Sequence, residues 1–174
     1  MSAATTTTRT ILVVGATGQQ GGHVLSELST LLSSPAEAKT KANVKILALT
    51  RSASSPKAAA LPHRYPALDL RVVEGDTRVP GPIFAAHPDI SAVFSYTTPP
   101  DEEPQATLLI DAAVAHGRAQ GRRVHFVFSS VDRGGEPGSW STPTEIPHFV
   151  QKHNVEVHLR AAADASEGGW GIRF

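Results

Sequence analysis

Three glycines near the start of the chain have the spacing of a phosphate-binding turn. Gly15, Gly18 and Gly21 form a GxxGxxG pattern directly after the apolar run at residues 11–14. Backbone N–H groups at a helix N-terminus attract phosphate if no side chain blocks the approach. Gly15 would allow a sharp turn, Gly18 the close approach of a pyrophosphate, and Gly21 tight packing of a helix on a strand. The pattern favours dinucleotide binding over a loop that is only rich in glycine.

The residues on either side of the glycines predict a strand, a turn and a helix. Residues 11–14 are all aliphatic, as in a strand that is buried on both faces. In residues 23–32 the apolar positions recur every three or four residues, as in an amphipathic helix that faces a sheet. We expect the turn to bring three polar residues to the dinucleotide as well: Thr17, Gln19 and Gln20.

Arg51 follows the second predicted strand, residues 44–50, at a position that distinguishes NADP from NAD. An acidic residue there accepts hydrogen bonds from the ribose 2′-hydroxyl, whereas an arginine accommodates a 2′-phosphate. Here Arg51 is followed by Ser52, with Lys57 further on, and there is no acidic residue beside them. The sequence therefore favours NADP as the cofactor, with NAD as the alternative. The competing interpretation of Arg51 is a solvated loop residue.

Two later predicted strands also end in polar residues. Asp76 follows the strand at 70–74, where it would either lie near the adenine ring or cap a turn. Thr97 and Thr98 follow the strand at 92–96. Ligands of open parallel sheets bind outside the carboxyl ends of the strands, so residues 96–99 should face the cofactor. The alternative for the two threonines is a turn with a local hydroxyl cap.

Strand and helix patterns alternate along the whole chain, which predicts a three-layer α/β Rossmann fold with a mainly parallel sheet of about six strands. With 174 residues and no internal repeat, we expect a single domain, 1–174, in which residues 1–9 form a flexible N-terminus. The further predicted segments are helices at 55–65, 80–86, 104–117 and 148–161 and strands at 124–128 and 170–174.

Charge and cysteine content exclude several classes of protein. The 16 basic and 16 acidic residues give a net charge of zero without a basic run, which disfavours direct binding to nucleic acid or to anionic membranes. There is no cysteine, hence no disulfide or thiolate metal site, and we expect no metal. No stretch approaches the ~20 apolar residues of a membrane span, and the opening lacks the apolar core of a signal peptide. We expect an intracellular protein, located in the cytoplasm and, as a second location, the nucleus.

Five segments, in order along nearly the whole chain, resemble the NmrA-like group of atypical short-chain dehydrogenases: GATGQQGG, ALTRS, VVEGD, FVFSSVDRGG, and HFVQK followed by VEVHLR. Members of this group adopt the Rossmann fold and bind NAD(P). The best-known members are redox-sensing regulators, and the founding fungal member restrains a GATA-type transcription factor in nitrogen metabolite repression. Other members reduce quinones, isoflavones or phenylcoumarans. The resemblance implies a dinucleotide sensor that acts through a protein partner such as a transcription factor, with an NADPH-dependent reductase as the alternative.

The resemblance also singles out His148, Lys152 and Ser130. Short-chain dehydrogenases use a tyrosine as proton donor, a lysine one helical turn later, and a serine after the fifth strand. This chain has Lys152, but His148 replaces the tyrosine, and Ser129 or Ser130 occupies the serine region. A histidine can donate a proton. The HxxxK pattern nevertheless resembles the regulatory members, in which the lysine is kept as a cofactor contact. The plainer interpretation is that His148 is a polar residue of an early helix turn and Lys152 a solvated one.

Members of the group continue past the sixth strand with elements that form the substrate-side wall. This sequence has no counterpart of them, so we expect a C-terminally truncated member whose substrate pocket is largely missing, which disfavours catalysis. An open sheet edge and apolar residues at 170–174 would favour self-association. A third interpretation is a gene fragment with neither role.

Overall fold

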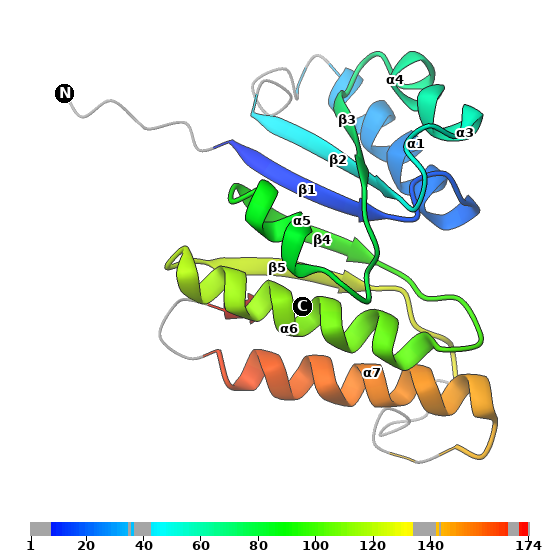
Figure 1. The fold of residues 1–174 in the computed structure, drawn as a ribbon, viewed down its shortest axis with the longest axis vertical. Helices are drawn as coiled ribbons and strands as arrows, with labels where there is room; N and C mark the ends of the chain where they lie inside the picture. Colours follow the sequence, from blue (N-terminus) through cyan, green and yellow to red (C-terminus); the bar gives the residue numbers. More distant parts are fainter. Residues whose placement is uncertain are drawn as a thin grey trace.

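The computed structural model describes residues 8–34, 36, 43–133, 142, 144–166 and 171–173. In this part of the chain, six strands form one sheet in the order β3-β2-β1-β4-β5-β6 (Figure 1). The strands are β1 (Arg9–Val14), β2 (Val44–Thr50), β3 (Asp69–Glu74), β4 (Ile90–Ser95), β5 (Arg123–Phe128) and β6 (Gly171–Arg173). All neighbouring pairs are parallel, so the strands end along one edge of the sheet. This confirms the predicted α/β sheet of about six strands.

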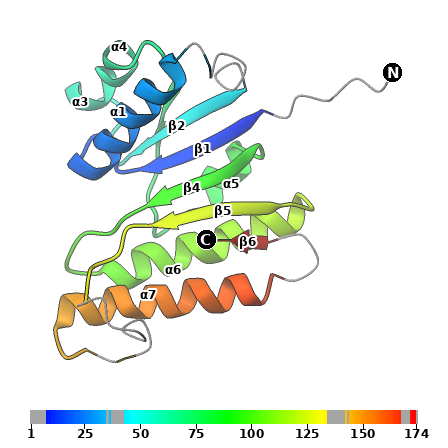
Figure 2. The ribbon, with the colours of Figure 1, turned by 180° about the vertical axis from the view of Figure 1, so that it is seen from behind.

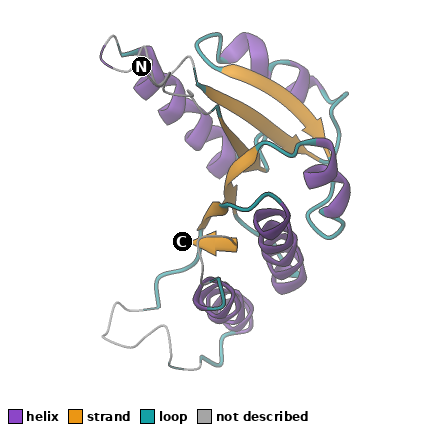
Figure 3. Ribbon diagram, turned by 90° about the vertical axis from the view of Figure 1, so that its left-hand side faces the viewer, coloured by secondary structure: helices purple, strands orange, loops and turns teal. Residues whose placement is uncertain are grey.

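Helices cover both faces of the sheet and complete the three predicted layers (Figures 2 and 3). On one face lie α1 and α4, and on the other α5, α6 and α7. The alternation of side chains along β1 explains both cores, because Leu12 packs into the α6 side and Val13 into the α1 side. The helices are α1 (Gln19–Ser33), α3 (Pro56–Ala59), α4 (Leu61–Arg64), α5 (Gly81–Ala86), α6 (Glu102–Ala119) and α7 (Pro147–Asp164).

The strand order reverses between β1 and β4, and this reversal positions the candidate site. The chain runs from β1 towards β2 and β3 on one side, and from β4 towards β5 and β6 on the other. The loops that follow β1 and β4 therefore lead away from each other and leave a crevice at the carboxyl edge. The glycine turn follows β1, and residues 96–101 follow β4.

Three boundaries differ from the sequence prediction. α1 begins at Gln19 and not at residue 23, so two glycines lie within its first turns. The helix predicted at 55–65 is two short helices that meet at Ala60, and Pro62 lies inside the second helix instead of closing the first. The predicted flexible N-terminus, 1–9, is too long, because Arg9 already belongs to β1 and its N–H donates to the Asn43 carbonyl at 2.7 Å. Residues 1–7 lie outside the described part.

Candidate functional site

The turn between β1 and α1 brings the predicted glycines against neighbouring backbone. Gly15 has a φ of +61°, a conformation that glycine adopts without strain. A Cβ atom on Gly21 would lie 2.5 Å from the carbonyl oxygen of Gly15, so α1 packs directly on the turn. The Ala16 N–H donates to the Leu49 carbonyl at 3.2 Å and ties the turn to β2. The turn is thus held firmly at the carboxyl edge of the sheet.

The N-terminus of α1 has the properties of an anion site. Gly18 is the N-cap, no described side chain caps this end, and the first turn of α1 holds no acidic residue. Gly18, Gln19 and Gln20 are exposed, and Thr17 is half-buried. No described side chain therefore hydrogen-bonds to the first N–H groups of the helix, and the positive end of its dipole favours an anion there. That this end holds a dinucleotide stays a prediction.

A cleft of about 640 Å³ lies beside the turn, between the start of α1 and the helices α3 and α4. Thr17 and Gln19 line it on the α1 side, while Lys57 and Arg64 line it on the other. Both of these cations are exposed. The cleft thus carries positive charge on the wall that faces the anion site, which suits a ligand with more than one phosphate group.

Arg51 and Ser52 are exposed at the carboxyl end of β2, although they do not line this cleft. The sequence shows no acidic residue beside Arg51, but the register of the sheet pairs Thr50 with Glu74. The Glu74 carboxylate accepts a hydrogen bond from the Ala53 N–H at 2.7 Å and holds the loop after β2. Residue spacing could not reveal this carboxylate, because only the pairing of β2 with β3 brings it there.

Asp76 and Thr98 form local hydrogen bonds. The Arg78 N–H donates to Asp76 Oδ1 at 2.8 Å. This bond corresponds to the second of the two roles predicted for Asp76, the capping of a turn. The Thr98 N–H donates to Gln105 Oε1 at 3.3 Å, and the Thr98 carbonyl accepts from Gln105 Nε2 at 2.8 Å. These contacts fix the loop after β4 to α6, and the proposed contacts of both residues with a cofactor stay predictions.

Lys152 is buried in a network of polar groups. Its ammonium lies 3.1 Å from Glu102 Oε2, 3.0 Å from Thr97 Oγ1 and 3.3 Å from the Ser129 carbonyl oxygen. Only 5% of Lys152 is exposed and none of Glu102. His148 Nδ1 contacts the second oxygen of Glu102. The interpretation of Lys152 as a solvated surface residue is therefore wrong.

Glu102 carries the negative charge of this network. Burial by itself would raise the pKa of Glu102, but the hydrogen bonds from Thr97, Lys152 and His148 and the charge of Lys152 outweigh burial and lower the pKa below its ordinary value. Glu102 is therefore ionised at neutral pH and pairs with the ammonium of Lys152. The sequence did not single out Glu102, which lies 46 residues before its partner His148.

Ser130 belongs to a different cluster. Its hydroxyl contacts the carboxylate of Glu156, which also accepts two hydrogen bonds from the Arg133 guanidinium at 2.8 and 2.5 Å. Burial alone would raise the pKa of Glu156, but the hydrogen bonds from Arg133 and Ser130 lower it. Ser129 is the serine beside Lys152, through its backbone carbonyl. The structure thus does not bring Ser130 together with the network of Lys152.

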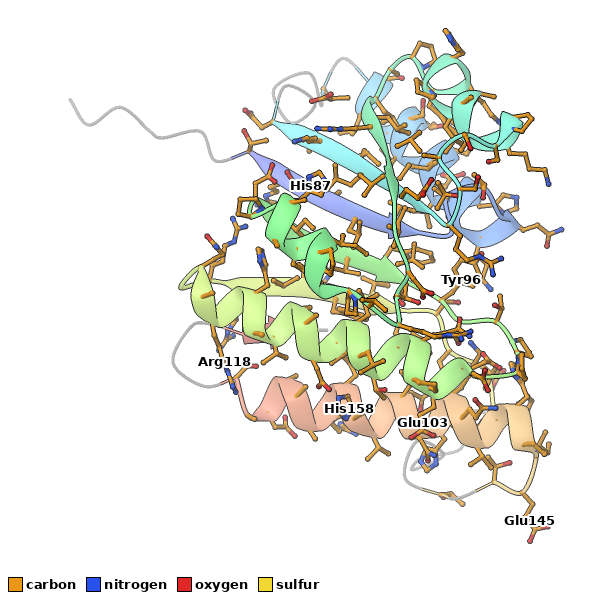
Figure 4. All side chains as sticks on the ribbon, in the orientation of Figure 1. His87, Tyr96, Glu103, Arg118, Glu145 and His158 are labelled. Carbon is orange, nitrogen blue, oxygen red and sulfur yellow. The ribbon has the colours of Figure 1, made fainter. Side chains whose placement is uncertain are left out.

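Among the described residues, neither tyrosine takes part in the hydrogen-bond network of Lys152. The Tyr65 hydroxyl donates to the Gly22 carbonyl at 3.0 Å, and Tyr96 lies over the glycine turn (Figure 4). Within the described residues, no hydrogen bond joins either phenol to Lys152. No group of three or more potential metal ligands occurs among the described residues, and none of the described helices is both long and apolar enough to span a membrane.

A sequence match to the NmrA-like family extends over residues 7–166, which is most of the chain. The chain belongs to the NmrA-like family. No curated protein matches this NmrA-like protein at a significant level.

Solved structures show the same fold at low sequence identity. NmrA, a negative transcriptional regulator solved in complex with NADP, is 19% identical, with a TM-score of 0.58 over 89% of this chain and 42% of that chain. Pen from Bacillus thuringiensis is 20% identical, with a TM-score of 0.66 over 98% of this chain and 49% of that chain. The Citrobacter sp. triphenylmethane reductase, solved with NADP(H), is 21% identical, with a TM-score of 0.55 over 88% and 45%. This NmrA-like protein therefore spans less than half the length of these relatives.

Proposed function

We propose that this NmrA-like protein binds NADP(H) at its glycine turn and passes the state of the dinucleotide to a protein partner, as a redox- or nitrogen-responsive sensor or transcriptional co-regulator. The observation that carries the proposal is the uncapped N-terminus of α1 on the turn formed by Gly15, Gly18 and Gly21. Proteins of the same fold add support, since NmrA has been solved with NADP and with NAD, and triphenylmethane reductase with NADP(H). NAD is the alternative cofactor.

The residues present fit such a ligand. The first N–H groups of α1 would hold the pyrophosphate, and Arg51 with Lys57 would hold the 2′-phosphate. The contact of Lys152 with the nicotinamide ribose, which the family resemblance implies, would require its ammonium to leave the carboxylate of Glu102. Bound NADPH can supply a hydride to a reaction, whereas a sensor would hold NADPH without transferring the hydride. A transcription factor is the proposed kind of partner, and the two proteins would meet in the cytoplasm or the nucleus. Self-association of the chain through the edge of its sheet stays a prediction.

The network around Lys152 favours sensing over reduction. A short-chain reductase lowers the pKa of a neighbouring phenol with its lysine, but here the ammonium faces the carboxylate of Glu102. His148 stands where the phenol would be, and its Nδ1 is engaged by the same carboxylate. The polar groups are thus paired with one another, which leaves His148 as the single candidate proton donor of this helix turn.

Thermal unfolding in the presence of NADPH or NADP+ tests the proposed sensor. A ligand that binds only the folded protein increases the free energy of unfolding, by about 3 kcal/mol when its concentration is a hundred times Kd. The melting temperature rises accordingly. We expect stabilisation by both forms, to different extents, without consumption of NADPH. Equal stabilisation by the two forms would contradict a sensor of redox state.

A reductase is the second candidate because Glu102 orients His148. With Nδ1 held by the carboxylate, and with 41% of the His148 side chain exposed, Nε2 can exchange a proton with a substrate. The test is NADPH oxidation with quinones and carbonyl compounds. Turnover that is lost in His148→Asn and kept in His158→Asn would support a reductase. His158 is a matched control because it lies on α7 like His148, but outside the site, where it pairs with Asp111 of α6. A flat trace with every substrate supports the sensor.

Exchanging the charge at Arg51 should change cofactor preference. Arg51→Asp removes the partner of the 2′-phosphate and supplies an acceptor for the ribose 2′-hydroxyl. Because hydrogen bonds to charged groups contribute about 1.5–3 kcal/mol, we expect the ratio of the NADPH and NADH dissociation constants to shift by about 10- to 100-fold towards NADH. Arg118→Asp is the control, since Arg118 is exposed in the last turn of α6. Unchanged selectivity in Arg51→Asp would refute the role of Arg51.

A further inference from the structure

Tyr96, the first residue after β4, lies directly over the glycine turn. A Cβ atom on Gly15 would be 2.4 Å from the Tyr96 hydroxyl oxygen and 2.5 Å from its Cε1 atom. A Cβ atom on Gly18 would be 2.7 Å from the same oxygen. The phenol therefore rests on both glycines, and it can do so only because neither has a side chain.

The phenol occupies space that a phosphate would need. Gly15 and Gly18 are the two positions where the backbone can be approached closely, and the N-terminus of α1 begins next to them. A pyrophosphate that contacts these N–H groups must lie within van der Waals distance of the same glycines. A phenol and a phosphate cannot share that volume.

The phenol is half-buried on the turn and is not held there by a hydrogen bond of its hydroxyl to any described residue. Among the described residues, no hydrogen bond is made by the Tyr96 hydroxyl, in contrast to Tyr65, whose hydroxyl donates to the Gly22 carbonyl. The backbone beyond Tyr96 is fixed, because Thr97 donates to Glu102 at 2.6 Å and Thr98 is bonded to Gln105. Rotation of the side chain between staggered rotamers is therefore the route by which the ring can leave the turn.

We propose that Tyr96 covers the phosphate-binding turn of the free protein and that a dinucleotide binds only after the ring has rotated away. This inference rests on the proposed function. The apparent dissociation constant is then the intrinsic value divided by the fraction of molecules in which the turn is open. Tyr96 is thus a determinant of dinucleotide affinity that acts against binding.

Calorimetric titration of NADPH into the intact chain tests this role. If the ring covers the turn in about 90% of molecules, Tyr96→Ala raises the affinity about tenfold. Tyr96→Phe retains the ring over Gly15 and removes the oxygen that lies on Gly18, so its affinity should lie between those of the wild type and Tyr96→Ala. Leu31→Ala, which removes an exposed apolar side chain from the far part of α1, is the control for truncation. Equal or weaker binding by Tyr96→Ala would overturn the inference, as would weaker binding by Tyr96→Phe, since the hydroxyl would then assist the ligand.

Fluorine NMR gives a second readout that needs no activity. The chain has only two tyrosines, so labelling with 3-fluorotyrosine yields two resonances, and the one absent from Tyr96→Phe belongs to Tyr96. We expect NADPH to shift this resonance, and an unchanged resonance in the saturated protein would overturn the inference. If neither the wild type nor Tyr96→Ala binds NADPH, the proposed function fails. If the wild type and Tyr96→Ala bind NADPH equally well, only the proposed role of Tyr96 fails and the proposed function stands.

Discussion

Gly21→Val should abolish dinucleotide binding and destabilise the fold. The first side-chain atom would lie 2.5 Å from the carbonyl oxygen of Gly15, 2.7 Å from its carbonyl carbon and 2.9 Å from the Cα of Ala16. These are backbone atoms of a turn that is tied to β2, so the collision can be relieved only by moving α1 away from the sheet. Such overpacking costs about 1–3 kcal/mol. The displaced helix N-terminus would no longer face the phosphate.

Gly22→Ala is the matched control for this change. A Cβ atom on Gly22 would meet only the Ala16 carbonyl oxygen, at an ordinary distance of 3.9 Å. Because alanine favours helix over glycine by about 1 kcal/mol, Gly22→Ala should be neutral or stabilising. Urea unfolding and NADPH titration of both variants provide the comparison. Normal binding by Gly21→Val would show that the close approach of α1 to the turn is not required.

Glu102→Gln should cause a large loss of stability. The substitution keeps the shape of the side chain but leaves the ammonium of Lys152 buried without a counter-charge. Breaking a buried pair in this way costs about 3–5 kcal/mol. Glu103→Gln is the control, because Glu103 is the next residue on α6 and accepts its hydrogen bond from Asn154 at the surface. Equal urea midpoints for the two variants would contradict the role of Glu102.

The pH dependence gives an independent test of the same pair. The pKa of Glu102 is lower in the folded protein than its ordinary value of 4.5. Its ionised form therefore stabilises the fold fully above that value, and the stabilisation is lost as the pH falls through the lower, folded pKa. Glu102→Gln should show a smaller loss of stability on acidification than the wild type does. If the free energy of unfolding had the same slope against pH in both proteins, the pKa of Glu102 would not differ between the folded and unfolded states.

The parts of the fold that local pattern controls could be predicted from sequence. The aliphatic run before Gly15 is buried on both faces of the sheet, as its composition requires, and the alternation of strands and helices predicts the three layers. The helix predicted at 55–65 is interrupted at Ala60, because Pro62 has no N–H to donate to the preceding turn. Local rules thus describe the elements well and their boundaries less well.

The candidate site depends on contacts that local pattern does not contain. Glu102 and Glu103 are adjacent glutamates with the same sequence context, and only the packing of α6 against α7 buries the first of them beside Lys152. The strand predicted at 92–96 ends one residue earlier, at Ser95, and the contact of the Tyr96 ring with Gly15 joins residues that are 81 positions apart in the chain. Glu74 reaches the end of β2 only through strand register.

Titration calorimetry with NADPH, NADP+, NADH and NAD+ measures whether the glycine turn binds a dinucleotide. We expect one site per chain, tighter binding of NADPH and NADP+ than of NADH and NAD+, and loss of binding of all four in Gly21→Val. Absence of binding heat for all four dinucleotides, at several temperatures and with a cooperatively folded protein, would contradict dinucleotide binding at this turn.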